Sequence, residues 1–235
     1  MIRRMTRGCI ATLPFAAILA LAGSSYCQDP ATIRSVIDVL RSGHFSGSLE
    51  YRGSCYGEND YVTRTFPITT TPTGHSAPPL QILQEMFAKD EGMQVTQEPD
   101  GTVRMVEKAV PQDLLNVKIE HLSFDDERRK KDGWLFSFSP PAVLTFIIGA
   151  PEVKAFMKDQ GIGWEPRWVN EPTTPEPHVS GELNNVTLSQ ALDYMAKTFR
   201  GLWVYKECPG NKENKRIVDL YFYRSWERAT TGTAP

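Results

Sequence analysis

The chain has 235 residues, with 26 basic and 28 acidic side chains and a formal net charge of −2. A chain of this length can bury a sizeable core in one domain or in two small ones. The short basic run at residues 128–131 directly follows the acids at residues 125–127, so its charge is cancelled locally. This balance gives no attraction for phosphate backbones or for an anionic membrane surface, and we expect no nucleic-acid partner.

The N-terminus predicts a secretory signal peptide. Three arginines among the first seven residues precede an uncharged, apolar stretch from Gly8 to Ala22 that is too short for a comfortable membrane span. Ala20-Leu21-Ala22 has the form of a cleavage site, so residues 1–22 are the expected signal peptide, with later cleavage near Cys27 as an alternative. An uncleaved anchor or a buried helix is the other interpretation. We expect a secreted or periplasmic protein without a stable membrane span after cleavage.

The cysteines predict one disulfide bond in the exported protein. Cys9 leaves with the signal peptide, and Cys55 and Cys208 each follow a predicted strand. In an oxidising compartment we expect these two to form a bridge, although two free buried thiols remain the alternative. Closing so long a loop is worth about 4–5 kcal/mol in the chain-entropy model. The chain has no CxxC pair, which argues against a thioredoxin-type site and a zinc knuckle.

Residues 28–124 form the first predicted α/β unit. A helix is expected over residues 31–42, and an alternating strand follows within residues 45–55. After a Pro- and Thr-rich loop, a second helix begins at Pro79 and is expected to end by Gly92. Two alternating runs on either side of Asp100-Gly101 then predict a β-hairpin.

Residues 125–178 form a predicted helical insertion with a proline-rich linker. The uncharged stretch over residues 134–151 contains two adjacent prolines, which favours a strand and a short buried helix over a membrane span. Another helix is expected from Pro151 to Gly161. Residues 163–180 have little periodicity and are interpreted as a linker or an irregular binding loop.

Residues 179–224 repeat the order of helix, glycine, strand, turn and strand. Thr187 and Gln190 have the spacing of a capping box, and Gly201 is the expected end of the helix. Two β-rich runs follow, and residues 225–235 are expected to be a flexible tail. The predicted fold class is therefore α+β, with two helix plus β-hairpin units packed as small mixed sheets and an inserted helical segment.

No local pattern supports catalysis, a metal or a cofactor. The four histidines are isolated from one another, without the spacing of metal ligands, and no glycine-rich phosphate loop occurs. The candidate binding residues are Trp164 and Trp168, which can stack on a sugar or anchor a protein. In the alternative interpretation both tryptophans fold back over the core.

Residues 183–193, followed by the helix and by residues 201–205, resemble the short N-terminal domain shared by secretins and TonB-dependent receptors. In that family a strand leads into an N-V-(T/P)-L-x-x-A-L helix start, and a glycine and another strand follow. The resemblance lies mainly in residues 180–222 and implies a periplasmic α/β module that contacts other proteins and has no catalytic residues to carry over. A long insertion between the two candidate units departs from the pattern.

These features favour an exported, non-enzymatic module that binds another protein of the cell envelope. Exposed sheet edges in small α/β units can accept a strand from a partner. Two alternatives remain: a glycan-binding module or hydrolase that acts on cell-wall polysaccharide through Trp164 and Trp168, and a structural component of the envelope.

Overall fold

The computed structural model describes residues 33–53, 78–124, 140–164 and 179–224. The predicted signal peptide, Cys55, Trp168 and the predicted tail lie outside these ranges. The described elements are, in chain order, α1 (Ile33–Ser42), β1 (Gly47–Arg52), α2 (Pro79–Phe87), β2 (Met93–Gln97), β3 (Val103–Glu107), β4 (Lys118–Ser123), α4 (Pro140–Ile148), α5 (Pro151–Gln160), β5 (Ile162–Trp164), β6 (Glu182–Thr187), α6 (Leu188–Phe199), β7 (Gly201–Pro209) and β8 (Arg216–Arg224).

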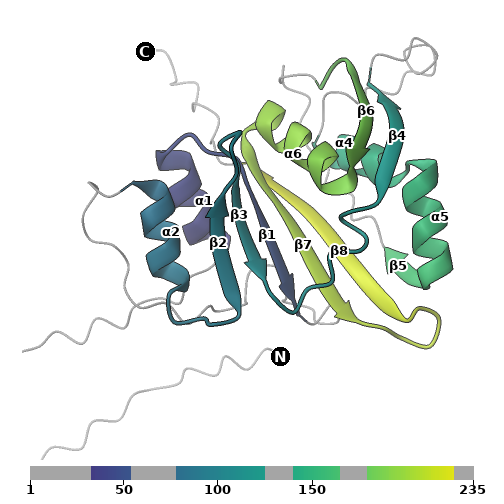
Figure 1. Ribbon diagram of the computed structural model, residues 1–235, viewed down its shortest axis with the longest axis horizontal. Helices are drawn as coiled ribbons and strands as arrows, with labels where there is room; N and C mark the ends of the chain where they lie inside the picture. Colours follow the sequence, from purple (N-terminus) through teal and green to yellow (C-terminus); the bar gives the residue numbers. More distant parts are fainter. Residues whose placement is uncertain (1–32, 54–77, 125–139, 165–178, 225–235) are drawn as a thin grey trace, which may run out of the picture.

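The fold is α+β, as predicted, and its two hairpins belong to one sheet. Six strands follow the order β2-β3-β1-β7-β8-β5, and β4 and β6 form a separate two-stranded sheet. The hairpins β2–β3 and β7–β8 are both antiparallel, whereas β1 runs parallel to its two neighbours β3 and β7. Strand β1 therefore joins the two helix-hairpin units across the middle of the sheet (Figure 1).

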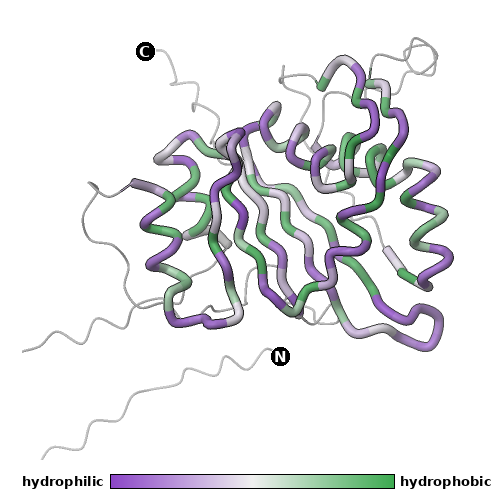
Figure 2. Tube along the Cα trace, in the orientation of Figure 1, coloured by the Kyte–Doolittle hydropathy of each residue, from purple (hydrophilic) through white to green (hydrophobic). Residues whose placement is uncertain are grey.

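Two hydrophobic cores lie against this sheet, and β7 contributes to both. Leu202 and Val204 belong to the first core, together with α1, α2, β1 and β3. Trp203 and Tyr205 belong to the second core, together with α4, α5, α6 and β4. Side chains alternate between the faces of a strand, so one strand can serve both cores. Figure 2 shows hydrophobic segments recurring along these strands, while the turn between β7 and β8 is hydrophilic.

The ends of the helices partly follow the predicted signals. Thr187 and Gln190 form the predicted capping box, with the Gln190 amide donating to Thr187 Oγ1 over 3.2 Å. Gly161 ends α5 in the left-handed conformation, with φ of 65°. The prediction that Gly201 ends α6 is wrong, because Arg200 is the left-handed residue and Gly201 begins β7. A Cβ at Gly201 would lie 2.3 Å from the Tyr223 carbonyl oxygen, so the close approach of β8 requires the glycine.

Strand β4 and the sheet it forms with β6 are not among the predicted elements. Ile119 and Leu122 are the buried residues of β4, and both belong to the second core. Their spacing of three does not give the alternation by which a half-buried strand is recognised. Helix α6 is the longest helix in the described part of the chain, with 12 residues, and none of these helices is long and apolar enough to cross a membrane.

Candidate protein-binding edge

Strand β2 lies at one edge of the six-stranded sheet. It pairs with β3 in a regular antiparallel register in which Val95 lies opposite Met105. The predicted hairpin is confirmed: the Glu98 amide donates to the Thr102 carbonyl over 2.9 Å, and Gly101 adopts a φ of 88° in the turn. The turn chemistry fixes the register of the hairpin and therefore which β2 residues face outward.

The backbone groups of Val95 and Gln97 point away from the sheet. The Val103 amide donates to the Ser46 carbonyl over 3.0 Å, so the odd-numbered residues of β3 face β1 and its even-numbered residues face β2. In an antiparallel ladder, residues alternate between bonding the neighbouring strand and pointing away from it. The even-numbered residues of β2 therefore bond β3, and the odd-numbered residues face outward.

The outward-facing groups of β2 have few contacts. The Gln84 side chain of α2 reaches the Val95 carbonyl, with its Nε2 3.5 Å from the oxygen, at the limit of a hydrogen bond. Within the described ranges, no carbonyl or side chain accepts a hydrogen bond from the amide of Val95 or Gln97. These two residues thus present donors and acceptors at the spacing that an additional strand requires.

Strand β2 also lacks the features that usually protect an edge. Proteins protect edge strands with charged side chains, prolines, bulges or very short length. Strand β2 is five residues long and reads Met-Gln-Val-Thr-Gln, without a charge or a proline, and its pairing with β3 has no bulge. At the opposite edge of the sheet, β5 has only three residues. We therefore regard β2 as the candidate functional site of the described structure.

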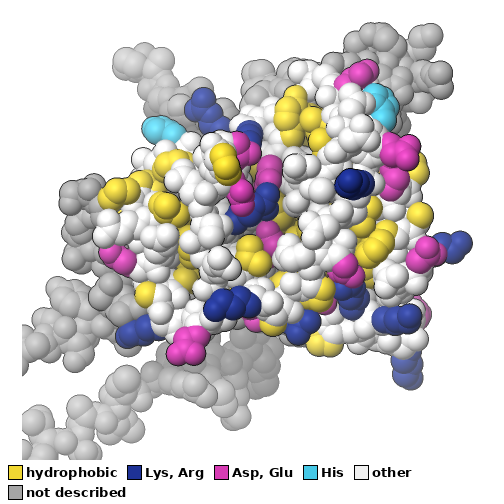
Figure 3. All heavy atoms as spheres, viewed as in Figure 1, with side chains coloured by type: hydrophobic (Ala, Val, Ile, Leu, Met, Phe, Trp, Pro, Cys, Tyr) yellow, Lys and Arg dark blue, Asp and Glu magenta, His cyan; other side chains and the backbone are white. Residues whose placement is uncertain are grey.

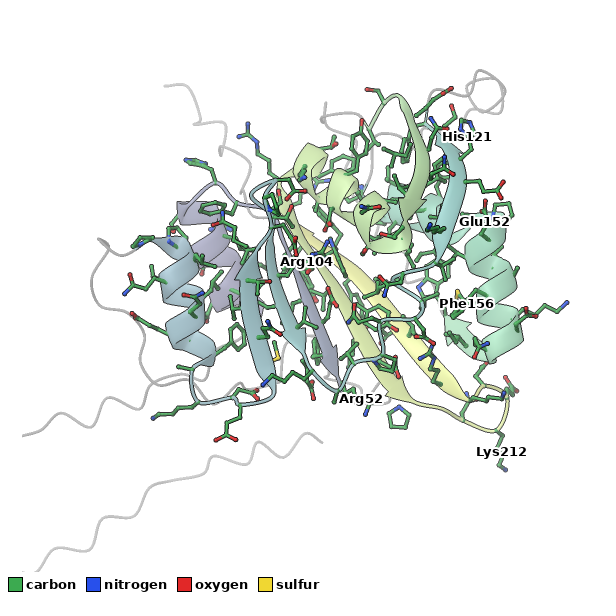
Figure 4. The ribbon with its side chains drawn as sticks, viewed as in Figure 1. Arg52, Arg104, His121, Glu152, Phe156 and Lys212 are labelled. Carbon is green, nitrogen blue, oxygen red and sulfur yellow. The ribbon has the colours of Figure 1, made fainter. Side chains whose placement is uncertain are left out.

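A cluster of charged side chains fixes the hairpin against α6. The Arg104 guanidinium on β3 lies 3.2 Å from Glu98, 3.5 Å from Glu50 on β1, and in direct contact with Asp193 on α6. The Trp203 indole also donates to Asp193, over 2.8 Å. Figure 3 shows basic and acidic side chains meeting near the centre of this face, where Figure 4 labels Arg104.

Burial dominates the electrostatics of this cluster. The side chains of Glu50 and Asp193 are 1% and 6% exposed. Burial raises the pKa of both carboxyls above their ordinary values, although the Arg104 charge opposes the shift. Neither acid is left without a hydrogen bond, since Gln112 donates to Glu50 over 2.8 Å. Within the described ranges, no group of three or more His, Cys, Asp or Glu side chains is placed to hold a metal ion. We therefore interpret the Arg104 cluster as a structural contact that positions the hairpin.

A second ionic contact joins the turn of the hairpin to α6. Lys197 Nζ lies 2.5 Å from Asp100 Oδ2. Its hydrogen bond is the main reason why the pKa of Asp100 falls to about 2. Together with the Arg104 cluster, this pair ties the turn end of the β2–β3 hairpin to α6, which belongs to the second core. The hairpin is therefore held in place on both sides of the sheet, because its own apolar residues pack in the first core.

The predicted disulfide partner Cys208 is buried near the end of β7. The Gly53 amide donates to the Glu207 carbonyl over 3.0 Å, so the end of β1 lies beside Cys208. Cys55 follows Gly53 by two residues, a span of about 7 Å at most. The position of Cys55 lies outside the described residues, and the bridge stays a prediction that this register makes geometrically reasonable.

The two candidate tryptophans do not form a described site. Trp164 ends β5 and is half-buried against the second core, as in the interpretation in which it covers the core. Trp168 lies outside the described residues. Of the four histidines, His44 and His121 are exposed, and His121 contacts Asn184 over 2.8 Å; His75 and His178 lie outside the described residues.

A cavity of about 510 Å³ lies at the far end of β7, beside Arg52, Glu207, Cys208 and Arg216. Its charged lining is already paired in part, because Arg216 lies 3.5 Å from Glu207 and 2.7 Å from Asp113. This internal pairing weakens any attraction for a charged small molecule.

The sequence predicted the strand at residues 93–97 but not its position at the edge of the sheet. Residues 93–97 form an uncharged strand next to the strongest turn signal in the chain. Which hairpin strand would lie at the edge depends on β1, which inserts between the hairpins from elsewhere in the sequence.

Comparisons with protein-family models, with curated proteins and with solved structures found no match to this chain.

Proposed function

We propose that this protein is an exported, non-enzymatic binding module of the cell envelope that holds another protein by adding one of its strands to β2. The observation that carries the proposal is the outward-facing backbone of Val95 and Gln97 on an edge without charge, proline or bulge. In strand addition, main-chain hydrogen bonds supply affinity, each worth about 0.5–1.5 kcal/mol net.

The rigid support of the hairpin favours this function. A binding strand that is already ordered loses little conformational entropy when a partner docks. Arg104 pairs with Asp193 and Asp100 pairs with Lys197, so two ionic contacts tie the turn end of the hairpin to α6. The order of β6, the capped helix α6, Gly201 and β7 is also the order in the short N-terminal domains that residues 180–222 resemble.

The direct test compares two substitutions of Val95. Val95→Pro removes the outward amide and costs no bond of the β2–β3 ladder, whereas Val95→Ala removes a similar part of the side chain but keeps the amide. The mature protein and both variants serve as bait for an extract of the cell envelope. We expect the protein and Val95→Ala to retain the same partner and Val95→Pro to lose it.

Gln97→Pro provides a second variant of the same kind, because the Gln97 amide also points outward. Circular dichroism and thermal unfolding establish that each variant is folded before it is used. Equal retention by the folded proline variants and by Val95→Ala would exclude strand addition at β2. Failure of the unmodified protein to retain any partner at micromolar bait would count against the whole proposal.

A further inference from the structure

Acidic side chains lie at both ends of β2. Asp90 and Glu91 lie within three residues before the strand, and Glu98 and Asp100 lie within three residues after it. Glu85 is exposed on α2, the helix whose Gln84 contacts the β2 backbone. We refer to these five acids as the acidic rim of β2. Over residues 79–108, from α2 through β3, the chain has six acidic and three basic residues.

The bases in this region offset the rim only in part. Arg104 forms ion pairs with Glu98 and with the buried acids Glu50 and Asp193. Its positive charge is largely neutralised by these acids, so it repels a cationic strand only weakly. Lys108 Nζ is directed to the Glu91 carbonyl oxygen over 2.9 Å. Lys197 of α6 pairs with Asp100, and Lys89 adjoins Asp90, so the six acids of residues 79–108 still exceed the three bases of this region and Lys197 together. The rim therefore attracts cationic side chains at both ends of a strand docked on β2.

A second copy of this chain is a poor occupant of the edge. Two β2 strands paired antiparallel about Val95 would bring Asp90 and Glu91 of one copy to Glu98 and Asp100 of the other. The same approach occurs twice because of the two-fold symmetry. Like charges that face each other across strands are destabilising, so self-pairing works against the charges at both ends.

The side chains in the middle of β2 favour a partner strand with a particular alternation of apolar and polar residues. Val95 packs against the first core, and Met93 on the same side of the strand is buried there. On the opposite side lie Gln94 and Thr96, which are polar and uncharged. A complementary strand alternates apolar and polar side chains, with its apolar residues on the side of Val95.

On the basis of the proposed function, we infer that the strand accepted by β2 comes from a different protein and carries Lys or Arg at both ends of an uncharged, alternating centre. The backbone of β2 supplies the attachment, and the acidic rim selects the partner and its placement. Electrostatic selection of this kind weakens as salt screens the charges.

The test uses three synthetic peptides with one alternating Val/Thr centre and with Lys, Gln or Glu at both ends. Binding to the mature protein is followed through the amide resonances of Val95 and Gln97. We expect affinity to fall in the order Lys, Gln, Glu, with roughly tenfold between the extremes at low salt and less at high salt. The protein itself is expected to sediment as a monomer.

Charge reversal at the rim gives the matched variant. Glu85→Lys combined with Glu91→Lys is expected to remove or invert the order of the peptides. The control, Glu213→Lys, changes an exposed acid on the distant β7–β8 turn and is expected to leave the order unchanged. Val95→Pro is expected to abolish binding of all three peptides.

Three results would overturn the inference: equal affinity for the three peptides, no binding of any of them, or a dimer that Val95→Pro separates. None of these results decides the proposed function, which depends on the Val95→Pro and Val95→Ala baits. A partner that those baits distinguish and that ignores the charge of the rim would uphold the function and refute the inferred chemistry of the partner.

Discussion

Strands β2 and β4 both lie at sheet edges, and their outward backbone groups are treated differently. In β4, which is six residues long, the Glu120 amide donates to Glu152 Oε1 of α5 over 3.0 Å. Figure 4 shows Glu152 between α5 and β4. Lys118 and Glu120 add exposed charges along β4. Strand β2 is uncharged, and among the described residues the one side chain that contacts its outward backbone is Gln84, which reaches the Val95 carbonyl.

The difference shows that one edge of this fold, strand β4, is protected by a side-chain hydrogen bond and by exposed charges. A carboxylate that accepts a hydrogen bond from an outward-facing backbone amide occupies the place of a neighbouring strand. Exposed charges along the strand also make pairing with another strand unfavourable. The open edge of β2 is thus not a general property of the molecule. It distinguishes β2 from β4 in the described part of the chain, and for this reason we place the proposed binding role at β2 rather than at β4.

The largest expected effect concerns the frame that carries β2. If Cys55 and Cys208 are bridged, Cys208→Ala is expected to lower the free energy of unfolding by about 4–5 kcal/mol. Urea unfolding before and after reduction provides the measurement, and reduction is expected to leave Cys208→Ala unchanged. Equal thiol labelling of both cysteines with and without prior reduction would show that they were already free.

Removal of the Arg104 charge is expected to have the next largest effect. Arg104→Leu leaves Glu50 and Asp193 buried without their cation, which is expected to lower the free energy of unfolding by about 3–5 kcal/mol. Lys197→Ala is the control, because its pair with Asp100 is more exposed and contributes at most about 1 kcal/mol. A loss of similar size in both variants, measured by urea unfolding, would contradict the assigned role of the Arg104 cluster.

Opening β4 provides a direct way to break the comparison between the two edges. Glu152→Ala removes the acceptor of the Glu120 amide and is expected to lower the free energy of unfolding by about 1 kcal/mol. The variant is also expected to self-associate more at high protein concentration, as seen by sedimentation. Glu152→Gln keeps an oxygen acceptor and is expected to behave more like the unmodified protein. Identical association of all three proteins would show that Glu152 does not protect the edge.

The smallest effect requires no substitution. In native-state hydrogen exchange, the amides of Val95 and Gln97 are expected to exchange at least about tenfold faster than those of Gln94 and Thr96, which bond β3. The Glu120 amide is expected to be protected by Glu152. Binding of a partner strand should slow exchange at Val95 and Gln97 selectively. Equal protection along β2 in the free protein would mean that its outward face is already covered.

Local signals predicted much of the fold, and the edge was beyond their reach. Asp100-Gly101 specifies a turn, and Thr187 with Gln190 specifies a helix start, because each acts on neighbouring backbone groups. Gly201 shows the limit: its sequence position suggests a helix end, whereas its need for glycine arises from Tyr223 on the neighbouring strand.

The candidate site depends on pairings of the same long-range kind. An edge is defined by the absence of a neighbouring strand, which no local pattern reports. The helix-hairpin repeat suggested two sheets, and only the pairing of β1 with both β3 and β7 makes one sheet with β2 at its border. Strand β4 was missed because its two buried residues lack the alternation of a half-buried strand.

The central position of β1 has a consequence for how the chain folds. Gly47 pairs with Val103 on one side and with Leu202 on the other. Contacts between segments so far apart in sequence form slowly, because a long loop must close first. Strand β7 supplies residues to both cores, so neither core is complete until β7 is present. Such a chain is expected to stay unfolded for longer after synthesis, and the proposed export would require an unfolded chain.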